Sequence, residues 1–221
     1  MGLIVLVVGD LHGDWTYLWR ALESERPDLI LSVGDWGDPD EVSEADFRHL
    51  LDRVPIYTVF GNHDDLSLLA SLKNRDGSPI LIANGSVVQV GDAVIAGISG
   101  IWAKSKRKPY YITNEEIVGA AQVLQDKGVS IFITHGCPIG LADLTPKGSH
   151  GGQRAFLEAF RLVKPKLYLC GHLHRPQMRT LKSGQIILNV GTTAQGDYAV
   201  VRIGSGSIDL IKRVVSSQPA G

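Results

Sequence analysis

Five short motifs contain the side chains of this sequence that are best suited to chemistry. Each has aspartate, asparagine or histidine close to glycine, and each follows an apolar, strand-like run: residues 9–13 (GDLHG), 34–38 (GDWGD), 61–64 (GNHD), 134–136 (THG) and 171–174 (GHLH). In α/β sheets the turn after a strand lies at the carboxyl edge, where ligands bind. Glycine lets the backbone turn tightly and approach a ligand closely. We therefore expect the five motifs to meet at one site.

The residue types in these motifs favour a pair of divalent metal ions. Carboxylate, imidazole and amide oxygen together suit first-row metals. Two such ions ~3.5–4 Å apart clamp the attacking and leaving oxygens of a phosphoryl displacement and lower the pKa of a shared water. A bridging carboxylate is a natural way to hold that spacing. In the first and fifth motifs, Asp10 with His12, and His172 with His174, can aim at one point if the backbone is extended there.

Taken singly, each of these residues has a simpler structural explanation. Asp10 could cap a helix, and Asp35, Asp38 and Asn62 could be ordinary turn residues. His135, which follows an apolar run, could be a hydrogen-bonded histidine of the core. However, five of the seven histidines lie in the five motifs, and His150 is in another predicted loop, so all the simpler explanations would have to hold at once. The set as a whole favours metal binding.

The first half of the chain alternates strand-like and helix-like segments. The strands are expected at 3–8, 29–33 and 56–60, and the helices at 14–26, 43–53 and 65–73. Strands that alternate with helices in this way indicate parallel pairing with crossover helices. The first three motifs then follow neighbouring parallel strands.

The second half is richer in strands. Two apolar runs at 86–90 and 93–98 flank Gly91-Asp92 and predict a hairpin. Further segments are expected as helices at 114–127 and 153–163 and as strands at 131–134, 166–170, 185–190, 198–203 and 207–213. Without internal repeats or a long linker, the chain is expected to form one domain over 1–215 with a flexible tail at 216–221.

Composition narrows the classes of function. Among 221 residues the net charge is −1, so no global positive field for nucleic acid exists and any polyanion must meet a local patch. The two cysteines form no CxxC pair, which favours reduced thiols and a cytoplasmic protein. The initial apolar run has no basic region before it and predicts a strand, not a signal peptide. No apolar stretch approaches the ~18–20 residues of a membrane helix, so no membrane partner is expected.

Together the motifs resemble those of the calcineurin-like metallophosphoesterase superfamily. Its pattern is DxH, then GDxxD, then GNH(D/E), then a histidine after a strand, then GHxH. All five occur here in that order between Asp10 and His174. The resemblance implies an α/β fold, a four-layer α/β/β/α sandwich with two mixed β-sheets and a metal site at the loop edge of the strands. It is strongest to the small prokaryotic-type phosphodiesterases and phosphatases.

The resemblance also implies a role for each matching residue. One metal ion would be held by Asp10, His12, Asp35 and His174. The second would be held by Asp35, Asn62, His135 and His172, with Asp35 bridging the two ions. The implied catalytic pair is His63, which contacts the phosphate and protonates the leaving oxygen, with Asp38 to orient it. The cofactor is then two divalent metal ions per chain, with Mn favoured over Fe, Ni, Co or Zn.

The sequence departs from some branches of the superfamily. Ser/Thr phosphatases carry DRG after the second motif and favour Glu after GNH, whereas this chain has Pro39 after Asp38, and Asp64. Phosphoprotein phosphatase activity is therefore not expected. Residues 97–101 (GISGI) are similar to a segment of RNA lariat debranching enzymes, but those usually replace the first-motif aspartate by cysteine, and Asp10 is retained here. Residues 143–154 resemble a loop of small prokaryotic members.

Two regions are candidates for contact with substrate. Residues 102–111 (WAKSKRKPYY) place Lys104, Lys106 and Arg107 among aromatic residues, a mixture that can hold phosphates and stack bases. The simpler interpretation is a solvated, mobile loop. His150 and Arg154 are weaker candidates for phosphate contacts. If the basic loop folds over the metals, the small phosphorylated substrate would be a nucleotide or short nucleic acid.

The function expected from these features is hydrolysis of a phosphodiester, or of a phosphomonoester, by in-line attack of a metal-bridging hydroxide. A non-catalytic scaffold that binds protein partners is the alternative, but such members tend to lose ligands, and here every ligand position is intact. A nuclease for long DNA is disfavoured because many phosphate contacts require more lysine and arginine. The oligomeric state is not indicated.

Overall fold

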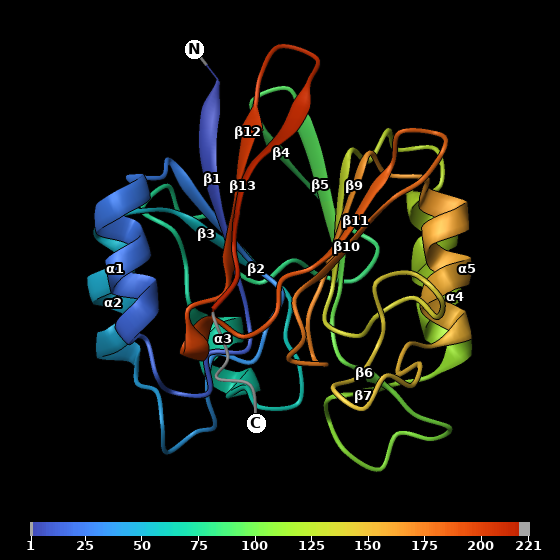
Figure 1. Cartoon of the computed structure of the whole chain (residues 1–221). Helices are drawn as coiled ribbons and strands as arrows, with labels where there is room; N and C mark the ends of the chain where they lie inside the picture. The colour runs from blue at the N-terminus through green and yellow to red at the C-terminus, as the bar shows by residue number, and fades with distance from the viewer. Residues whose placement is uncertain (1, 217–221) are drawn as a thin grey trace.

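Two β-sheets pack face to face between two layers of helices in the computed structural model, which describes residues 2–216 (Figure 1). The first sheet has the order β13-β12-β1-β2-β3. Its strands are β1 (Leu3–Val8), β2 (Leu29–Ser32), β3 (Ile56–Thr58), β12 (Tyr198–Ile203) and β13 (Ile208–Val214). As predicted, β1, β2 and β3 run parallel, while β12 joins β1 antiparallel.

The second sheet has the order β10-β11-β9-β8-β5-β4. Its strands are β4 (Val87–Val90), β5 (Ala93–Ile98), β8 (Ile131–Thr134), β9 (Leu167–Cys170), β10 (Gln177–Thr180) and β11 (Ile186–Asn189). The four central strands are parallel, and both edge strands are antiparallel to their neighbours. The hairpin predicted around Gly91-Asp92 is confirmed as β4–β5.

Helices cover the outer face of each sheet. They are α1 (Thr16–Glu25), α2 (Glu44–Leu51) and α3 (Leu66–Ser71) beside the first sheet, and α4 (Asn114–Leu124) and α5 (Arg154–Val163) beside the second. Local chemistry fixes where two of them begin. Ser43 and Thr113 each accept a hydrogen bond from the backbone three residues later, and the acid at that position bonds back, forming capping boxes at α2 and α4.

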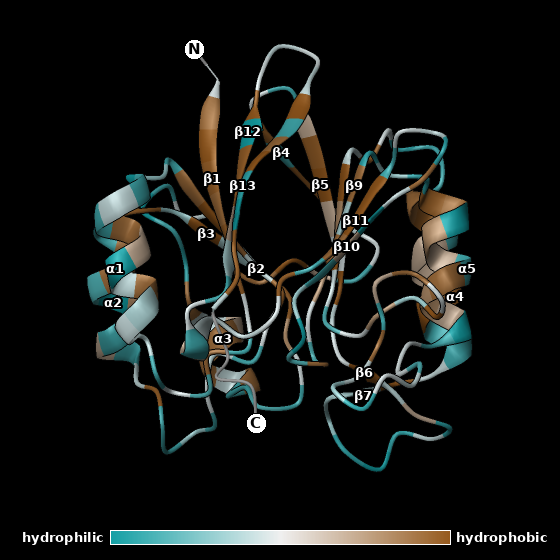
Figure 2. Ribbon diagram, viewed as in Figure 1, coloured by the Kyte–Doolittle hydropathy of each residue, from teal (hydrophilic) through white to brown (hydrophobic). Residues whose placement is uncertain are grey.

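The alternation of apolar residues along β1 explains the layers. Val5 and Val7 lie in the apolar layer between the two sheets, whereas Leu6 and Val8 lie in the layer between the first sheet and its helices. A third apolar layer joins the second sheet to α4 and α5. Side chains alternate between the faces of a strand, so a strand buried on both faces is apolar throughout. In Figure 2 most strands of the two sheets are brown, whereas teal is found on parts of the helices and on the loops. The predicted four-layer α/β/β/α sandwich is confirmed.

The differences from prediction are small and lie mostly at ends and edges. Predicted helices are longer than observed; residues 14–26, for example, contain α1 at Thr16–Glu25. Sequence patterns missed the short parallel pair β6 (Ile101–Trp102) and β7 (Tyr111–Ile112), the strand β10 and the 3-10 turn η1 (Thr193–Gln195). Strand β10 is a polar, largely exposed edge strand, so it has no apolar signal.

Two further predictions concern the C-terminal tail and the absence of a membrane helix. Apart from Ser216, the tail predicted at 216–221 lies outside the described residues. Within residues 2–216, no helix combines the length and apolar character needed to cross a bilayer.

Candidate metal centre

The five motifs follow β1, β2, β3, β8 and β9 at the carboxyl ends of these strands. The first three belong to one sheet and the last two to the other, so the site forms where the edges of both sheets meet. Backbone hydrogen bonds link the motifs directly. Asp10 N–H donates to the Gly34 carbonyl at 3.0 Å, and Gly171 N–H donates to the His135 carbonyl at 3.0 Å.

The backbone of the first and fifth motifs is not extended, contrary to expectation. Asp10 (φ 52°), His12 (φ 47°), His172 (φ 67°) and His174 (φ 52°) are all left-handed, and so is Asp35 (φ 57°). For residues other than glycine such a conformation costs about 1–3 kcal/mol, and it persists only where the surroundings impose it. Alternate left-handed residues turn the chain sharply, and this brings both side chains of each motif to one place. The strain is concentrated on residues expected to bind metal.

The predicted ligands converge in two groups. In the first, ligand atoms of Asp10, His12, Asp35 and His174 all lie within 4.8 Å of one another, and in the second so do those of Asp35, His135 and His172. Asp35 belongs to both groups. In the first group, the Nε2 atoms of His12 and His174 are 3.0 Å apart, and Asp10 Oδ1 is 3.2 Å from His174 Nε2.

Two orphaned atoms test whether these residues fit a metal ion. Among the described residues, Asn62 Oδ1 and His135 Nε2 are the buried side-chain atoms without a hydrogen-bond partner. The other ring nitrogen of His135, Nδ1, donates to the Val33 carbonyl at 2.8 Å, which leaves a lone pair on Nε2. His135 Nε2 lies 3.3 Å from Asp35 Oδ2, and both side chains are fully buried. Buried acceptors face to face require a cation, so the donor set fits a metal.

The charges of the metal-free site support the same conclusion. Burial alone would lower the pKa of His135, but the Asp35 carboxylate raises it to about 10. Burial would raise the pKa of Asp35, and His135 instead holds it well below its usual range. Burial, with repulsion from His135, lowers the pKa of His172 to about 4, and burial also lowers the pKa of His12. Without metal, a proton on His135 takes the place of the cation.

Metal binding at this site is therefore expected to release a proton. At pH 8 His135, with a pKa of about 10, is protonated in the metal-free protein, and an imidazole must be neutral to bind metal. Calorimetric titration with Mn²⁺ in buffers of different ionisation enthalpy should give about one proton more than the same titration of a His135→Asn variant. Raising the pH above about 10 should abolish the difference, because His135 is then already neutral. Equal proton release by both proteins at pH 8 would contradict this charge state.

The predicted catalytic pair lies beside the first ligand group. His63 Nδ1 is 3.1 Å from Asp38 Oδ2, and both side chains are about half exposed. The backbone N–H of His63 donates to Asp35 Oδ1 at 2.8 Å. The imidazole ring of His63 meets that of His12 edge to face, with centroids 5.0 Å apart. His63 thus has one nitrogen held by a carboxylate, and its ring is next to the ligands and open to solvent.

Asp64 is a functional-site residue that sequence reasoning missed. It is buried, and its carboxylate accepts backbone N–H groups of Asp35 (2.8 Å), Trp36 (2.8 Å) and Gly61 (2.7 Å). It therefore ties the second motif to the third and fixes the strained turn that presents Asp35. Burial, together with the charge of Asp35, raises the pKa of Asp64 to about 7. The available signal in the sequence was the position of Asp64, an acid directly after the candidate site residues Asn62 and His63.

Replacing Asp64 by asparagine should destabilise the protein. An amide offers one acceptor oxygen where three N–H groups need two, so its NH₂ group would face a backbone donor. The expected loss is about 1–3 kcal/mol in the free energy of unfolding, measured by urea denaturation of the metal-free protein. The exposed Asp40 offers a matched control, and Asp40→Asn should change stability little. Equal stability of the two variants would show that Asp64 does not hold the turn.

The candidate substrate contacts lie outside both ligand groups. Lys104, Lys106 and Arg107 are on an exposed loop between β6 and β7, and Arg154 is the exposed first residue of α5. His150 Nδ1 lies 2.8 Å from Oδ1 of the buried Asp143, which also accepts the N–H of Gly152. Sequence analysis missed Asp143 as the partner of His150. The loop that joins Asp143 to His150 is closed by an antiparallel bridge between Leu144 and His150. It packs on the fifth motif, because a Cβ on Gly151 would lie 2.8 Å from Leu173.

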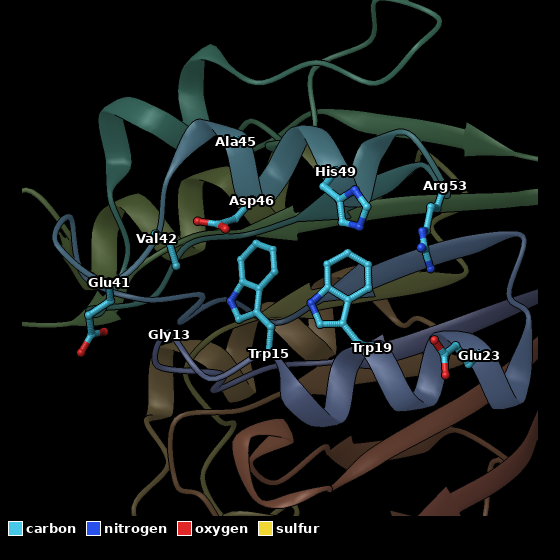
Figure 3. A pocket seen from close by; sticks show the side chains of 10 residues that line it. All are labelled: Gly13, Trp15, Trp19, Glu23, Glu41, Val42, Ala45, Asp46, His49 and Arg53. Atoms are coloured by element: carbon cyan, nitrogen blue, oxygen red, sulfur yellow. The ribbon is translucent and has the colours of Figure 1, made fainter.

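A surface groove of about 570 Å³ runs from the site between α1 and α2 (Figure 3). It begins at Gly13 and Glu41, next to the first and second motifs. Trp15 and Trp19 form one wall and point toward Asp46 and His49 of α2. Its charged lining residues are Glu23, Glu41, Asp46 and Arg53, so carboxylates outnumber the cation.

Comparisons with known proteins find a curated relative in sequence and solved structures of the same fold. The lariat debranching enzyme of Schizosaccharomyces pombe is 28% identical over 219 aligned residues, covering 76% of this chain and 47% of that enzyme. The chain thus spans about half the length of this curated relative. Two solved structures share the fold: TT1561 of Thermus thermophilus (TM-score 0.69, 15% identity, 95% and 98% of the two chains) and Zn²⁺-bound Vps29 of Entamoeba histolytica (TM-score 0.50, 15% identity, 96% and 98%).

The family assignment rests on most of the chain. The profile of the family described as calcineurin-like phosphoesterase matches residues 3–176, which include all five motifs. The chain belongs to the calcineurin-like phosphoesterase family.

Proposed function

We propose that this chain is a dinuclear metal-dependent phosphodiesterase. The observation that carries the proposal is that Asp35 belongs to both ligand groups, so this one residue could help to hold two neighbouring ions. One ion would be held by Asp10, His12, Asp35 and His174, and the other by Asp35, Asn62, His135 and His172. The donor set of carboxylate, imidazole and amide suits Mn²⁺ and other first-row ions. When bound, such a pair activates water and neutralises charge on the phosphate oxygens.

The chain's own residues would supply the remaining chemistry. In our proposal His63 contacts the phosphate and donates a proton to the leaving oxygen. Asp38, 3.1 Å from Nδ1, holds the ring so that the opposite nitrogen faces the reacting group. The backbone N–H of His63 donates a hydrogen bond to Asp35 Oδ1, and this hydrogen bond fixes the position of His63 relative to the shared ligand Asp35. Asp64 acts only through the turns that it connects.

The preference for a diester rests on two observations. The GNHD form of the third motif resembles the small phosphodiesterase-type members. The curated relative is named a lariat debranching enzyme, which favours a nucleotide or short nucleic acid as the phosphorylated substrate. A phosphomonoester is the alternative for the same site, because both reactions need the same paired ions.

Hydrolysis of two model substrates tests this proposal. Metal-stripped protein is restored with Mn²⁺, Ni²⁺ or Zn²⁺ and offered bis-p-nitrophenyl phosphate and p-nitrophenyl phosphate. We expect metal-dependent turnover of the diester at a higher kcat/KM than that of the monoester. Turnover of the monoester alone would move the assignment to a phosphatase. Turnover of neither, with two ions bound, would favour a scaffold with the phosphoesterase fold.

A further inference from the structure

The loop between β6 and β7 has an unbalanced positive charge. We call residues 103–110 the basic loop; it holds four basic residues and no acid, and residues 104–109 are all exposed. Lys106 forms an ion pair with Glu116 at 2.7 Å. In the part of the chain that the structure describes, Lys104, Arg107 and Lys108 form no ion pair. Three cations therefore face solvent without a partner.

The basic loop starts beside the metal centre and its base is fixed there. Gly100 N–H donates to the Phe60 carbonyl at 2.7 Å, and Phe60 directly precedes the third motif. Gly100 has φ 94°, and a Cβ there would lie 2.7 Å from the Tyr110 carbonyl, so only glycine fits this close crossing. Trp102 Nε1 donates to Asn114 Oδ1 at 2.6 Å. In Figure 1 the loop projects outward beyond β6 and β7 at the lower right.

The aromatic residues at the base of this loop pack within the fold, away from its exposed tip. Tyr110 and Tyr111 meet edge to face with centroids 5.1 Å apart, and both are partly buried. Trp102 is also partly buried and uses its N–H within the fold. The cations, in contrast, are at the exposed tip. Contacts from this loop are therefore to phosphates, which carry no base identity.

An acidic segment leads from the second motif into α2, and in Figure 1 it lies at the lower left, across the strand ends from the basic loop. Residues 39–46, which follow the second motif, contain four acids and no base. Of these, Glu44 forms an ion pair with Arg48 of α2, which leaves Asp40, Glu41 and Asp46 as the unbalanced charges. The groove that begins there, in Figure 3, adds Glu23 to Glu41 and Asp46, and its Arg53 lies over the ring of Trp19. Charges interact over about 10 Å at ordinary salt, so an anionic chain is repelled from this side and attracted to the basic loop.

We propose that the substrate is a single-stranded oligonucleotide whose phosphates on one side of the scissile bond lie along the basic loop. This inference rests on the proposed phosphodiesterase function and adds a binding site, made by Lys104, Arg107 and Lys108, for phosphates that are not cleaved. The acidic side receives only the short end of the substrate. Because the loop reads phosphates, affinity depends strongly on salt and weakly on sequence.

Charge reversal on the loop tests the proposal. The test variant is Lys104→Glu, Arg107→Glu, Lys108→Glu. The matched control is Arg161→Glu, Lys182→Glu, Arg202→Glu, which makes the same change in net charge at exposed positions away from the site, in α5, in the turn between β10 and β11, and in β12. Each Mn²⁺-loaded protein is assayed with a single-stranded octaribonucleotide and with bis-p-nitrophenyl phosphate.

The loop variant should lower the ratio of kcat/KM for the octaribonucleotide to that for the small diester by ~10-fold or more, and the control should leave the ratio within about twofold. Binding of the fluorescently labelled octaribonucleotide is measured by anisotropy in a His63→Asn background. There, the slope of log affinity against log salt should fall by about 0.7 for each lost contact. An unchanged ratio and slope, or an equal effect of the control, would overturn the proposal.

The binding measurement separates this inference from the proposed function. If no protein hydrolyses either substrate but the loop still governs octaribonucleotide binding, the phosphodiesterase assignment fails and the binding site stands. If the small diester is hydrolysed and the loop variant binds and cleaves the octaribonucleotide like the parent protein, the binding site fails and the phosphodiesterase assignment stands.

Discussion

An Asp35→Asn variant is expected to lose both metal ions together, and with them all measurable hydrolysis. Asp35 is the residue common to both ligand groups, and asparagine replaces one of its charged oxygens by an NH₂ group that cannot bind a cation. Loss of a residue that only hydrogen-bonds to a metal ligand costs roughly 10–100-fold in metal affinity. The loss of a shared ligand should exceed that at both positions. Metal content after gel filtration, measured by mass spectrometry, gives the result directly.

A His135→Asn variant provides the matched comparison. His135 belongs to the second ligand group alone, so its loss should release one ion and leave the first group (Asp10, His12, Asp35 and His174) occupied. Two tightly bound ions in the Asp35→Asn protein would contradict the bridging role. Loss of a single ion by both variants would show that Asp35 serves only one position.

The second large effect is expected from His63→Asn, with both ions retained. The ring of His63 is outside the two ligand groups and is held by Asp38 at 3.1 Å. Proton transfer by a positioned side chain contributes ~10²–10⁴-fold to rate, so kcat for the diester should fall by that factor. The backbone bond from residue 63 to Asp35 is unaffected by the substitution, so metal content should not change.

Two further variants show whether the effect comes from proton transfer. Asp38→Asn should give a smaller loss, ~10–100-fold, because it removes only the orienting partner. His49→Asn, on α2, removes a histidine that packs on Trp19 outside the ligand groups and should leave kcat unchanged. Full activity of the His63→Asn protein would remove this residue from the mechanism.

Much of the site was predictable because parallel strands place their carboxyl ends at one edge. Asp10, Asp35 and Asn62 follow strands β1, β2 and β3, and their order along the chain is therefore their order across the sheet. His135 and His172 follow β8 and β9 of the second sheet in the same way. The apolar runs before each motif made the strands recognisable, and the ligand types followed from the letters themselves.

The conformation of the motifs was not predictable from spacing. Alternate residues suggested an extended chain, but Asp10, His12, His172 and His174 are all left-handed. The left-handed conformation is uncommon for aspartate and histidine. It persists here because the tertiary contacts around these residues impose it, and spacing along the sequence does not reveal such contacts. The role of Asp64 was not predictable for the same reason. Its three backbone donors come from two turns that are distant in sequence, and only the folded structure brings them together.

The measurement that tests the two-metal account most directly is a titration of metal-stripped protein with Mn²⁺ while hydrolysis of bis-p-nitrophenyl phosphate is followed. The shared Asp35 predicts that turnover rises to a plateau at two equivalents of metal per chain and is absent from the Asp35→Asn protein at the same metal concentration. A plateau at one equivalent, or no turnover with two ions bound, would contradict the account.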